Sequence, residues 1–258
     1  MKLNVVKVGG AVIDDPQSLS AFLDAFVALE GPKVLIHGGG REATKIAAGM
    51  GVESQMINGR RVTDKATLDI VTMVYAGLVN KRIVSMLQAR GCNAIGLSGA
   101  DGDAIRATRR PAKPIDFGYV GDIVPADVNA TIINKLLECG LVPVFNAITH
   151  DGNGQLLNCN ADTIARSVAS GMAGIREVTL TFCFEMPGVL RDVNNPDSVI
   201  SVISKTDYPA LVEQGIIAGG MLPKIDNAFD SISHGVKTVS IRHWKDLAKS
   251  GAGTDIVA

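Results

Sequence analysis

The stretch Lys33–Gly49, KVLIHGGGREATKIAAG, places three consecutive glycines between a short apolar run and a helix-forming segment. Val34–Ile36 predicts a strand, and the residues from Glu42 onward predict a helix. A strand, a glycine turn and a helix together point free backbone N–H groups and the positive end of the helix at an anion. Because glycine has no Cβ, a ligand can also approach the main chain closely. The anion can be a phosphate or a carboxylate, and a plain βα turn that binds nothing shows the same pattern.

The composition narrows the class of protein. The 258 residues include 47% hydrophobic and 20% charged side chains, and the formal net charge is -1. This length suits one large α/β domain or two closely joined lobes with a substantial core. The near-neutral charge and the 4% aromatic content argue against a nucleic-acid surface.

Cysteine usage and hydropathy bear on the compartment. The four cysteines contain no CxxC pair, no signal sequence is visible, and the four histidines show no metal-ligand spacing. No apolar run reaches the roughly 18 residues that span a bilayer. We therefore expect a cytoplasmic protein with no membrane contact and no metal ion held by protein ligands alone.

Strand and helix patterns alternate along the chain, which predicts an α/β fold: a three-layer αβα sandwich with a mainly parallel central sheet. The predicted strands are 3–10, 34–36, 94–97, 142–145, 177–184 and 238–241. The predicted helices are 18–29, 42–49, 67–90, 132–139, 163–172, 208–214 and 225–234. Hairpins are expected at Asn58-Gly59 and at 151–154, with antiparallel excursions over 104–130.

Two features of the sequence predict how the chain divides into lobes and where a second subunit would pack. The weakest connection lies at 172–175, so we expect an N-terminal lobe over residues 1–173 and a C-terminal lobe over residues 174–258. The helix predicted at 67–90 carries apolar residues on more than one face. Such a helix is expected to pack both on the sheet and against a second subunit.

Two lysines beside glycine turns are the candidate cationic groups. Lys7 lies in an apolar strand just before Gly9-Gly10, and Lys224 follows a glycine-bearing loop before a helix. A buried ammonium is costly unless it reaches an anion or water, although a snorkelling lysine is the ordinary alternative. Asp162 precedes a helix, where an Asp is commonly an N-cap. Phosphoryl transfer needs this set of groups, because positive charge and N–H donors stabilise the migrating group.

Three other signatures fit less well. The P-loop pattern fails because the sequence contains no Gly-Lys pair. Gly38, Gly40 and Ala43 satisfy the dinucleotide pattern, but the acidic residue expected about 20 residues later is missing, so a nucleotide-cofactor oxidoreductase is a minor alternative. The HGGG run is also found in lipase-type hydrolases, yet the nearest candidate for their GxSxG motif, 96–100, lacks the last glycine.

Five motifs, in order over essentially the whole chain, resemble the series of the N-acetylglutamate kinases within the amino acid kinase family. They are KVGG at 7–10, HGGG at 37–40, NGRRVT at 58–63, LNCNAD at 157–162 and GGMLPK at 219–224. The first two are shared across the wider family, and the other three together are more specific. The resemblance implies the amino acid kinase fold. It also implies transfer of the γ-phosphate of ATP to the side-chain carboxylate of N-acetyl-L-glutamate, giving an acyl phosphate for arginine biosynthesis.

The resemblance also implies roles for residues that match the motifs. Lys7 and Lys224 would stabilise the migrating phosphoryl group, and Asp162 would orient the two lysines. Backbone N–H groups of Gly10, Gly39 and Gly40 would hold phosphate and the reacting carboxylate. The α-carboxylate side of the substrate would be bound by Arg61 and Asn158. The residues implied to cradle ATP are Glu185, Met186, Gly188, Ile216, Ile217 and Ala218, and Mg²⁺ would be held mainly by the phosphates.

The chain departs from the family pattern at 181–188. Glu185 stands where an Asp is usual, after an unusual Thr181-Phe182-Cys183-Phe184. This departure leaves a non-catalytic ligand-binding or regulatory homologue as an alternative, and the unknown width of the acyl pocket leaves N-succinylglutamate as an alternative acceptor. The first strand begins at Leu3, without the extra N-terminal helix of arginine-inhibited hexamers. We therefore expect a homodimer that arginine does not inhibit.

Overall fold

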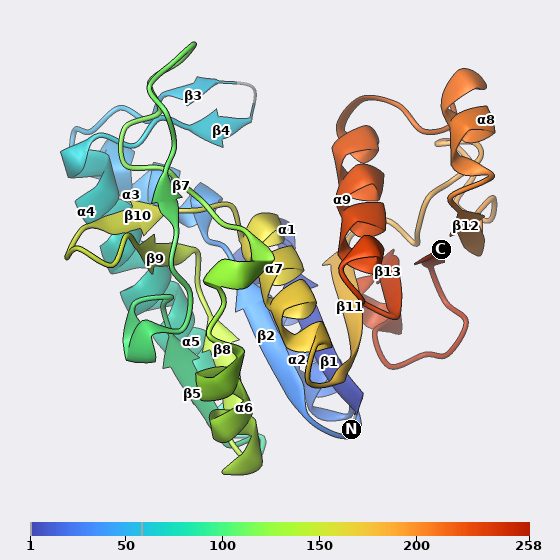
Figure 1. The fold of residues 1–258 in the computed structure, drawn as a ribbon, viewed down its shortest axis with the longest axis horizontal. Coiled ribbons are helices and arrows are strands. Elements are labelled where there is room, and N and C mark those ends of the chain that lie inside the picture. Colours follow the sequence, from blue (N-terminus) through green and yellow to red (C-terminus); the bar gives the residue numbers. More distant parts are fainter. Residues whose placement is uncertain (1, 58) are drawn as a thin grey trace.

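An eight-stranded sheet forms the centre of the computed structural model, which describes residues 2–57 and 59–258 (Figure 1). Its strand order is β12-β14-β13-β11-β1-β2-β8-β5. The strands are β1 (Lys2–Val8), β2 (Lys33–His37), β5 (Ala94–Leu97), β8 (Val142–Phe145), β11 (Glu177–Phe184), β12 (Val202–Ser204), β13 (Thr238–His243) and β14 (Thr254–Val257). Neighbouring strands run parallel, apart from β13 and β14, which run antiparallel. The predicted mainly parallel sheet is confirmed.

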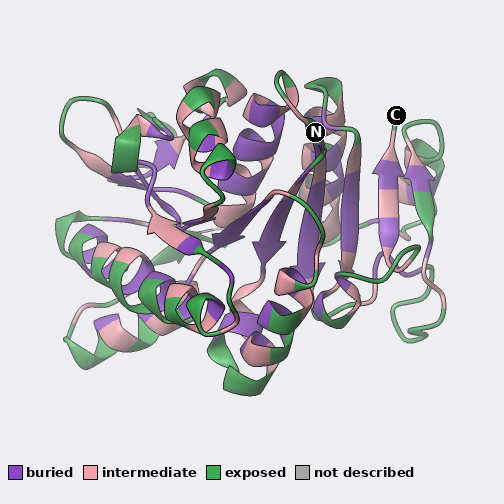
Figure 2. Cartoon of the chain, turned by 90° about the horizontal axis from the view of Figure 1, so that it is seen from below, coloured by how far each residue is buried: buried purple, intermediate pink, exposed green. Residues whose placement is uncertain are grey.

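Helices cover both faces of this sheet, and the strands between them are buried (Figure 2). The helices α6 (Ala130–Glu138), α7 (Ala161–Ala173) and α9 (Leu222–Ser233) pack on one face. The opposite face carries α2 (Pro16–Val27) and α5 (Asn80–Gln88). The three-layer αβα arrangement is therefore confirmed. The remaining α-helices are α1 (Gly10–Asp14), α3 (Gly40–Gly49), α4 (Lys65–Thr72) and α8 (Tyr208–Glu213).

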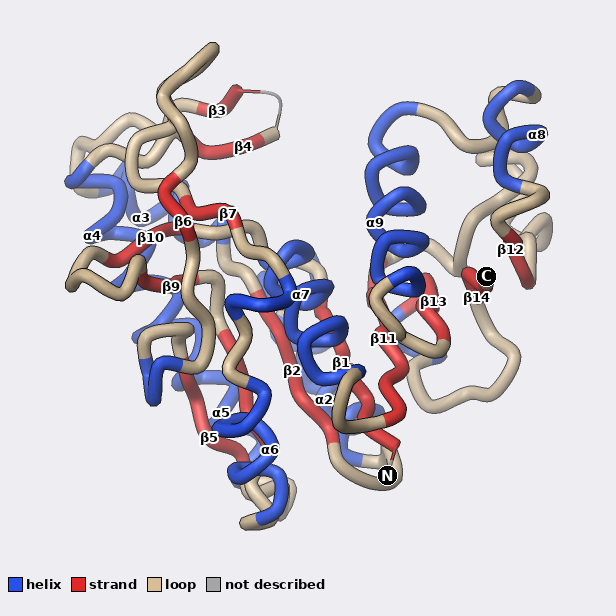
Figure 3. Tube along the Cα trace, viewed as in Figure 1, coloured by secondary structure: helices blue, strands red, loops and turns tan. Residues whose placement is uncertain are grey.

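Three short antiparallel pairs lie beyond one end of the sheet (Figure 3). They are β3 (Met56–Ile57) with β4 (Arg60–Arg61), β6 (Thr108–Arg109) with β7 (Gly121–Asp122), and β9 (Ile148–His150) with β10 (Leu156–Asn158). Both predicted hairpins and the antiparallel excursion are thus present. Asn58, which the first hairpin prediction also used, lies outside the described residues.

The helix predicted at 67–90 is continuous from Lys65 to Gln88, but its middle, η1 (Met73–Val79), is a π-helix. By length and mean hydropathy alone, this helix could cross a membrane. Polar and charged residues interrupt its apolar residues, which is why the sequence shows no continuous apolar run of about 18 residues. The core helix of a globular protein passes the same test, and 44% of the most apolar window is buried inside the protein. Met73 and Leu78 are 53% and 41% exposed. The expected second apolar face is therefore present on this helix.

Two details of the C-terminal third differ from the prediction. The strands β12 and β14 were not predicted, because these short segments are strands through their pairing with each other and with β13 rather than through a local apolar run. Lys224 was placed at the end of a loop but lies in the first turn of α9, after the 3₁₀ turn η4 (Gly219–Met221). The helix therefore fixes the direction of this lysine more tightly than a loop would.

The two expected lobes share this one sheet. β1 pairs with β11 from Lys2 opposite Glu177 to Val8 opposite Cys183, so main-chain hydrogen bonds cross the boundary. The boundary itself falls between α7 and β11, where Gly174 caps the helix. The division into lobes at 173/174 stays a prediction.

Lys33 is a buried lysine that stabilises the end of a core helix. Its Nζ donates to the carbonyl oxygens of Phe26 (3.2 Å), Val27 (2.8 Å) and Leu29 (2.5 Å), which lie at the end of α2 and just beyond it. Burial lowers the pKa of Lys33 below its usual value. An ammonium is well suited here, because the last carbonyls of a helix lack intrahelical donors and carry partial negative charge.

We expect Lys33→Met to lower the free energy of unfolding by about 2–3 kcal/mol, because the substitution leaves buried carbonyl oxygens without their charged hydrogen-bond donor. Urea unfolding followed by circular dichroism measures this change. The matched control is Lys237→Met, which removes an exposed ion pair with Glu177 (Nζ–Oε1 2.9 Å) and should cost less than about 1 kcal/mol. Equal stability of the two variants would contradict the role given to Lys33.

Candidate active site

The reversal of strand order around β1 defines the location of the site. β1 has β2 on one side and β11 on the other, and the sheet continues outward in both directions. Open α/β sheets bind ligands at the carboxyl ends of strands at such a point. Lys7 is the penultimate residue of β1, His37 ends β2, and Phe184 ends β11. The motifs KVGG and HGGG therefore open onto the same edge of the sheet.

The glycine loop after β2 is shaped by a close neighbour. Gly39 has φ 154° and caps α3, and a Cβ at this position would lie only 2.9 Å from Cδ1 of Tyr75. Both the backbone conformation and the available space therefore require glycine here. Tyr75 belongs to the π-helix and is 5% exposed. The π-helix thus places an aromatic ring directly against the turn that precedes α3.

His37 anchors the same loop without contributing charge. Its side chain is completely buried, and this burial lowers the pKa of His37 to about 4. The neutral ring accepts from Nδ2 of Asn80 at Nε2 (3.0 Å) and donates from Nδ1 to the carbonyl of Gly38 (2.7 Å). Asn80 also donates to the carbonyl of Val144 (2.9 Å), so the loop is tied to two strands.

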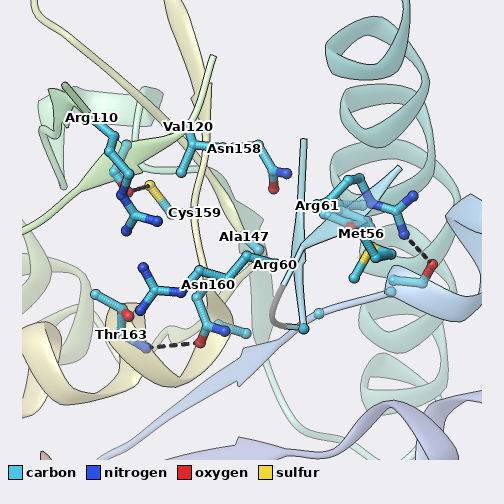
Figure 4. Close-up of a pocket in the computed structure, with 17 residues that line it drawn as sticks. Met56, Arg60, Arg61, Arg110, Val120, Ala147, Asn158, Cys159, Asn160 and Thr163 are labelled. Carbon is cyan, nitrogen blue, oxygen red and sulfur yellow. Dashed lines mark hydrogen bonds between the residues drawn. The ribbon is translucent and has the colours of Figure 1, made fainter. Parts of the chain in front are cut away.

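A cavity of about 220 Å³ lies over the glycine loop (Figure 4). Its walls come from the loop, the β3–β4 hairpin, the π-helix, β7, β10 and the start of α7. All four predicted substrate-binding residues line it: Gly39, Gly40, Arg61 and Asn158. The structure therefore brings these residues together from three separate segments: the glycine turn at the start of α3, β4 and β10.

Arg61 lines the cavity and also forms hydrogen bonds that hold the glycine loop and the start of α3 in place. Its guanidinium donates to the carbonyl of Gly40 (2.9 Å) and to hydroxyls of Thr44 (2.8 Å) and Ser54 (2.6 Å), and the residue is 8% exposed. Asn158 is also buried and donates from Nδ2 to Thr63 Oγ1 (3.0 Å). Both polar groups are thus held in fixed positions at the wall of the cavity.

Two further arginines and a tyrosine at this cavity were not among the predicted site residues. Arg60 and Arg110 line it together with Arg61 (Figure 4). Tyr75 is also part of the lining. The guanidinium of Arg110 pairs with Asp122, while its Nη1 is buried without a hydrogen-bond partner among the described residues. Arg60 belongs to the NGRRVT motif and could have been found there. Arg110 lies outside every motif, and its position depends on the β6–β7 excursion.

The two predicted catalytic lysines and Asp162 meet beside this cavity. Lys7 Nζ lies 2.8 Å from Asp162 Oδ1. Nζ of Lys7 and Nζ of Lys224 lie 5.3 Å and 3.9 Å from the ring centroid of Phe184. Burial lowers the pKa of Lys224, Asp162 opposes this shift, and the charge of Lys7 adds to it. The two amines thus face one aromatic ring, and one carboxylate interacts with both.

Asp162 is free for this pairing because another residue caps its helix. Asn160 is the N-cap of α7, and its Oδ1 accepts from the backbone N–H groups of Asp162 (2.7 Å) and Thr163 (3.3 Å). The N-cap alternative for Asp162 is therefore wrong. The first turn of α7 instead directs the carboxylate toward the end of β1.

A second cavity, of about 260 Å³, adjoins the first. Its lining includes Asp162, Lys224 and Phe184, and it shares Arg60 and Asn160 with the first cavity. Arg60 and Asn160 thus lie between the cavity over the glycine loop and the cavity at Lys224.

The residues predicted to cradle ATP do not line this second cavity. Glu185 and Met186 are exposed in the turn after β11, and Ala218 is exposed before η4. Ile217 is 1% exposed within the core. A Cβ on Gly188 would lie 2.7 Å from Thr254 Oγ1, so this glycine permits close packing on β14. A nucleotide contact with Gly188 or Ile217 would therefore involve the main chain. The roles of these residues, and of Gly10 and Ile216, stay predictions.

The family model and the similar proteins found by comparison point to the same family. A model of the amino acid kinase family matches residues 2–243. The chain is 51% identical over 255 residues to the acetylglutamate kinase of Phocaeicola vulgatus and 52% identical over 255 residues to that of Bacteroides thetaiotaomicron. Each alignment covers 99% of this chain and 98% of the relative.

The fold also matches a solved structure, the N-acetylglutamate synthase of Neisseria gonorrhoeae in complex with coenzyme A and N-acetyl-glutamate. The TM-score is 0.81 at 22% identity, and the match covers 100% of this chain and 59% of that chain. At this identity the likeness concerns the fold. The family model and the acetylglutamate kinases about half identical to this chain show that it belongs to the amino acid kinase family.

Proposed function

We propose that this protein is an ATP-dependent kinase that phosphorylates the side-chain carboxylate of N-acetyl-L-glutamate to the acyl phosphate, in arginine biosynthesis. The observation that carries the proposal is the meeting of Lys7, Asp162 and Lys224 beside the cavity over the glycine loop. Acetylglutamate kinases more than half identical over nearly the whole chain support the same activity.

The chemistry requires little beyond charge and position. A γ-carboxylate is already ionised at neutral pH, so no base has to remove a proton before it attacks the γ-phosphorus. A new P–O bond forms to the carboxylate as the bond to the ADP oxygen breaks, and negative charge spreads over the three transferred oxygens. Lys7 and Lys224 stabilise this charge, and Asp162 keeps the ammonium of Lys7 in place. The N–H groups at the start of α3 orient the acceptor.

The residues present fit a nucleotide triphosphate with its metal. The ammonium groups of Lys7 and Lys224 and the main chain of Gly10 would contact the phosphates, with the adenosine toward Glu185, Met186 and 216–218. Among residues 2–57 and 59–258, no three His, Cys, Asp or Glu side chains gather as a metal site. Mg²⁺ would therefore be held mainly by the phosphates, where it neutralises charge.

The arginines of the acceptor cavity favour a second acceptor of the same class. Arg60 and Arg110 line the cavity in addition to Arg61, and Nη1 of Arg110 has no hydrogen-bond partner among the described residues. An N-succinyl group would bring a third carboxylate, which a guanidinium binds well. N-succinylglutamate is therefore the alternative acceptor.

The test is ADP release, measured by a coupled assay, with N-acetylglutamate, N-succinylglutamate and free glutamate in parallel. We expect turnover with an N-acylglutamate and only background with free glutamate. If the succinyl group is the natural one, Arg110→Gln should lower kcat/KM for N-succinylglutamate more than for N-acetylglutamate. ATP binding without turnover on any acceptor would instead favour the non-catalytic homologue.

We further propose a cytoplasmic homodimer that arginine does not inhibit, with lobes at 1–173 and 174–258. The apolar, exposed Met73 and Leu78 on the long helix support a subunit contact there. Sedimentation of the protein and of Leu78→Glu tests this arrangement. A monomer at all concentrations, a hexamer, or inhibition by arginine would contradict it.

A further inference from the structure

Phe184 occupies the point where three structural elements converge on the phosphoryl site. In the β1–β11 pairing, Lys7 lies opposite Phe182, so Lys7, Phe182 and Phe184 point to the same face of the sheet. That face is covered by α7 and α9, which supply Asp162 and Lys224. Side chains alternate between the two faces of the sheet along β11, so the ring of Phe184, its last residue, points toward both lysines.

Two parts of the chain lie next to the ring of Phe184. Phe184 stacks on Phe182 with centroids 6.3 Å apart and an interplanar angle of 13°. On the other side, a Cβ added to Gly9 would lie 3.9 Å from Cδ1 of Phe184, so the ring also packs on the turn after β1. Phe182 and the turn after β1 thus border the ring of Phe184, and Nζ of Lys224 lies over its face.

Both ammonium groups lie within the range of a cation–π interaction, which extends to about 6 Å from the ring centroid. Nζ of Lys224 is the closer at 3.9 Å, and Nζ of Lys7 lies at 5.3 Å. Two ammonium groups at one site repel each other. Asp162, at 2.8 Å from Lys7, offsets this on one side. The negative face of the Phe184 ring offsets it at Lys224.

We propose that Phe184 is a positioning residue, whose ring face holds the Lys224 ammonium in its charged form at the place where the phosphoryl group is transferred. This inference rests on the proposed function for its effect on rate, but the contact itself exists in the protein alone. It gives a role to the unusual Thr181-Phe182-Cys183-Phe184 segment, which the family motifs do not explain. Mere packing of an aromatic ring is the competing explanation.

Stepwise fluorination of the ring separates the two explanations, because it weakens the negative π face with little change in shape. We expect kcat to fall progressively from phenylalanine through mono-, di- and trifluorophenylalanine at position 184, by about tenfold in total. The alkaline limb of the rate profile should move to lower pH, because a weaker ring stabilises charged Lys224 less. The other charged groups that act on Lys224 or line its cavity are Asp162, Lys7 and Arg60, and of these Lys7 also faces the ring, at the longer distance of 5.3 Å.

The matched control is the same series at Phe229, which lies on α9 like Lys224 but contacts the ring of Tyr208, with centroids 5.3 Å apart and an interplanar angle of 54°. Fluorination there should leave kcat within about twofold, since no reacting group faces that ring. A flat response at position 184, or equal responses at both positions, would overturn the proposal. Circular dichroism of each protein shows whether the fold is retained.

A second measurement does not depend on activity. The pKa of Lys224 can be obtained from the pH dependence of its acetylation by acetic anhydride, read by mass spectrometry, in wild type and in Phe184→Leu. We expect the pKa of Lys224 to be lower in Phe184→Leu, and Phe184→Tyr to restore it. An unchanged pKa would overturn the proposal even if the protein is an active kinase. A lowered pKa in a protein without kinase activity would refute only the proposed function.

Discussion

Lys224→Met should lower kcat by about 10²–10³-fold, because it removes a positive charge that stabilises the migrating phosphoryl group mainly in the transition state. Methionine keeps an unbranched side chain that reaches to Cε but lacks the ammonium group, so the first turn of α9 should be retained. Steady-state ADP release at saturating ATP and acceptor measures the effect. KM for the acceptor should change little, since the cavity over the glycine loop does not include Lys224.

The pH dependence gives a second readout for the same residue. Burial lowers the pKa of Lys224. The rate depends on the protonated amine, so kcat should be maintained below this pKa and lost as pH rises through it. The control Lys237→Met removes a surface amine and should leave both rate and profile unchanged. A near-normal kcat in Lys224→Met would refute its catalytic role.

Asp162→Asn should lower kcat by about 10–10²-fold, because it leaves Lys7 without its carboxylate at a partly buried site. Asparagine has the same shape, and Asn160 still caps α7, so the helix should begin at the same residue. Asp162 also opposes the lowering of the pKa of Lys224. The alkaline limb should therefore move to lower pH in this variant, and a pH–rate profile measures both effects.

Asp69→Asn is the matched control, since Asp69 forms an exposed pair with Lys65 (Nζ–Oδ1 2.5 Å). It should retain the rate and the profile of wild type. If Asp162→Asn loses activity without any shift of the alkaline limb, Asp162 acts on Lys7 alone. If it keeps full activity, the carboxylate does not position either lysine.

Much of the fold could be predicted because it is encoded locally. The strand β11 (Glu177–Phe184) was predicted with the observed bounds, and β2, its glycine turn and α3 follow from a short apolar run, residues without Cβ and a helix-forming segment. The prediction failed for elements whose conformation depends on contacts with other parts of the chain. β12 and β14 are strands only because their backbones pair with each other, and with β13 in the case of β14. The π-helix at Met73–Val79 is a change of hydrogen bonding that the apolar periodicity does not reveal.

The sequence by itself determined the glycine turns, the order of strands and helices, and the residues that carry charge beside them. Only the tertiary structure decided that Lys7 and Lys224 lie over one aromatic ring, that Asp162 pairs with Lys7 there, and that Arg110 lines the cavity over the glycine loop. The reason is physical. Turn and strand preferences act over a few neighbouring residues, whereas Coulomb and cation–π contacts act through space. Strand order and register brought these distant residues within a few ångströms of one another.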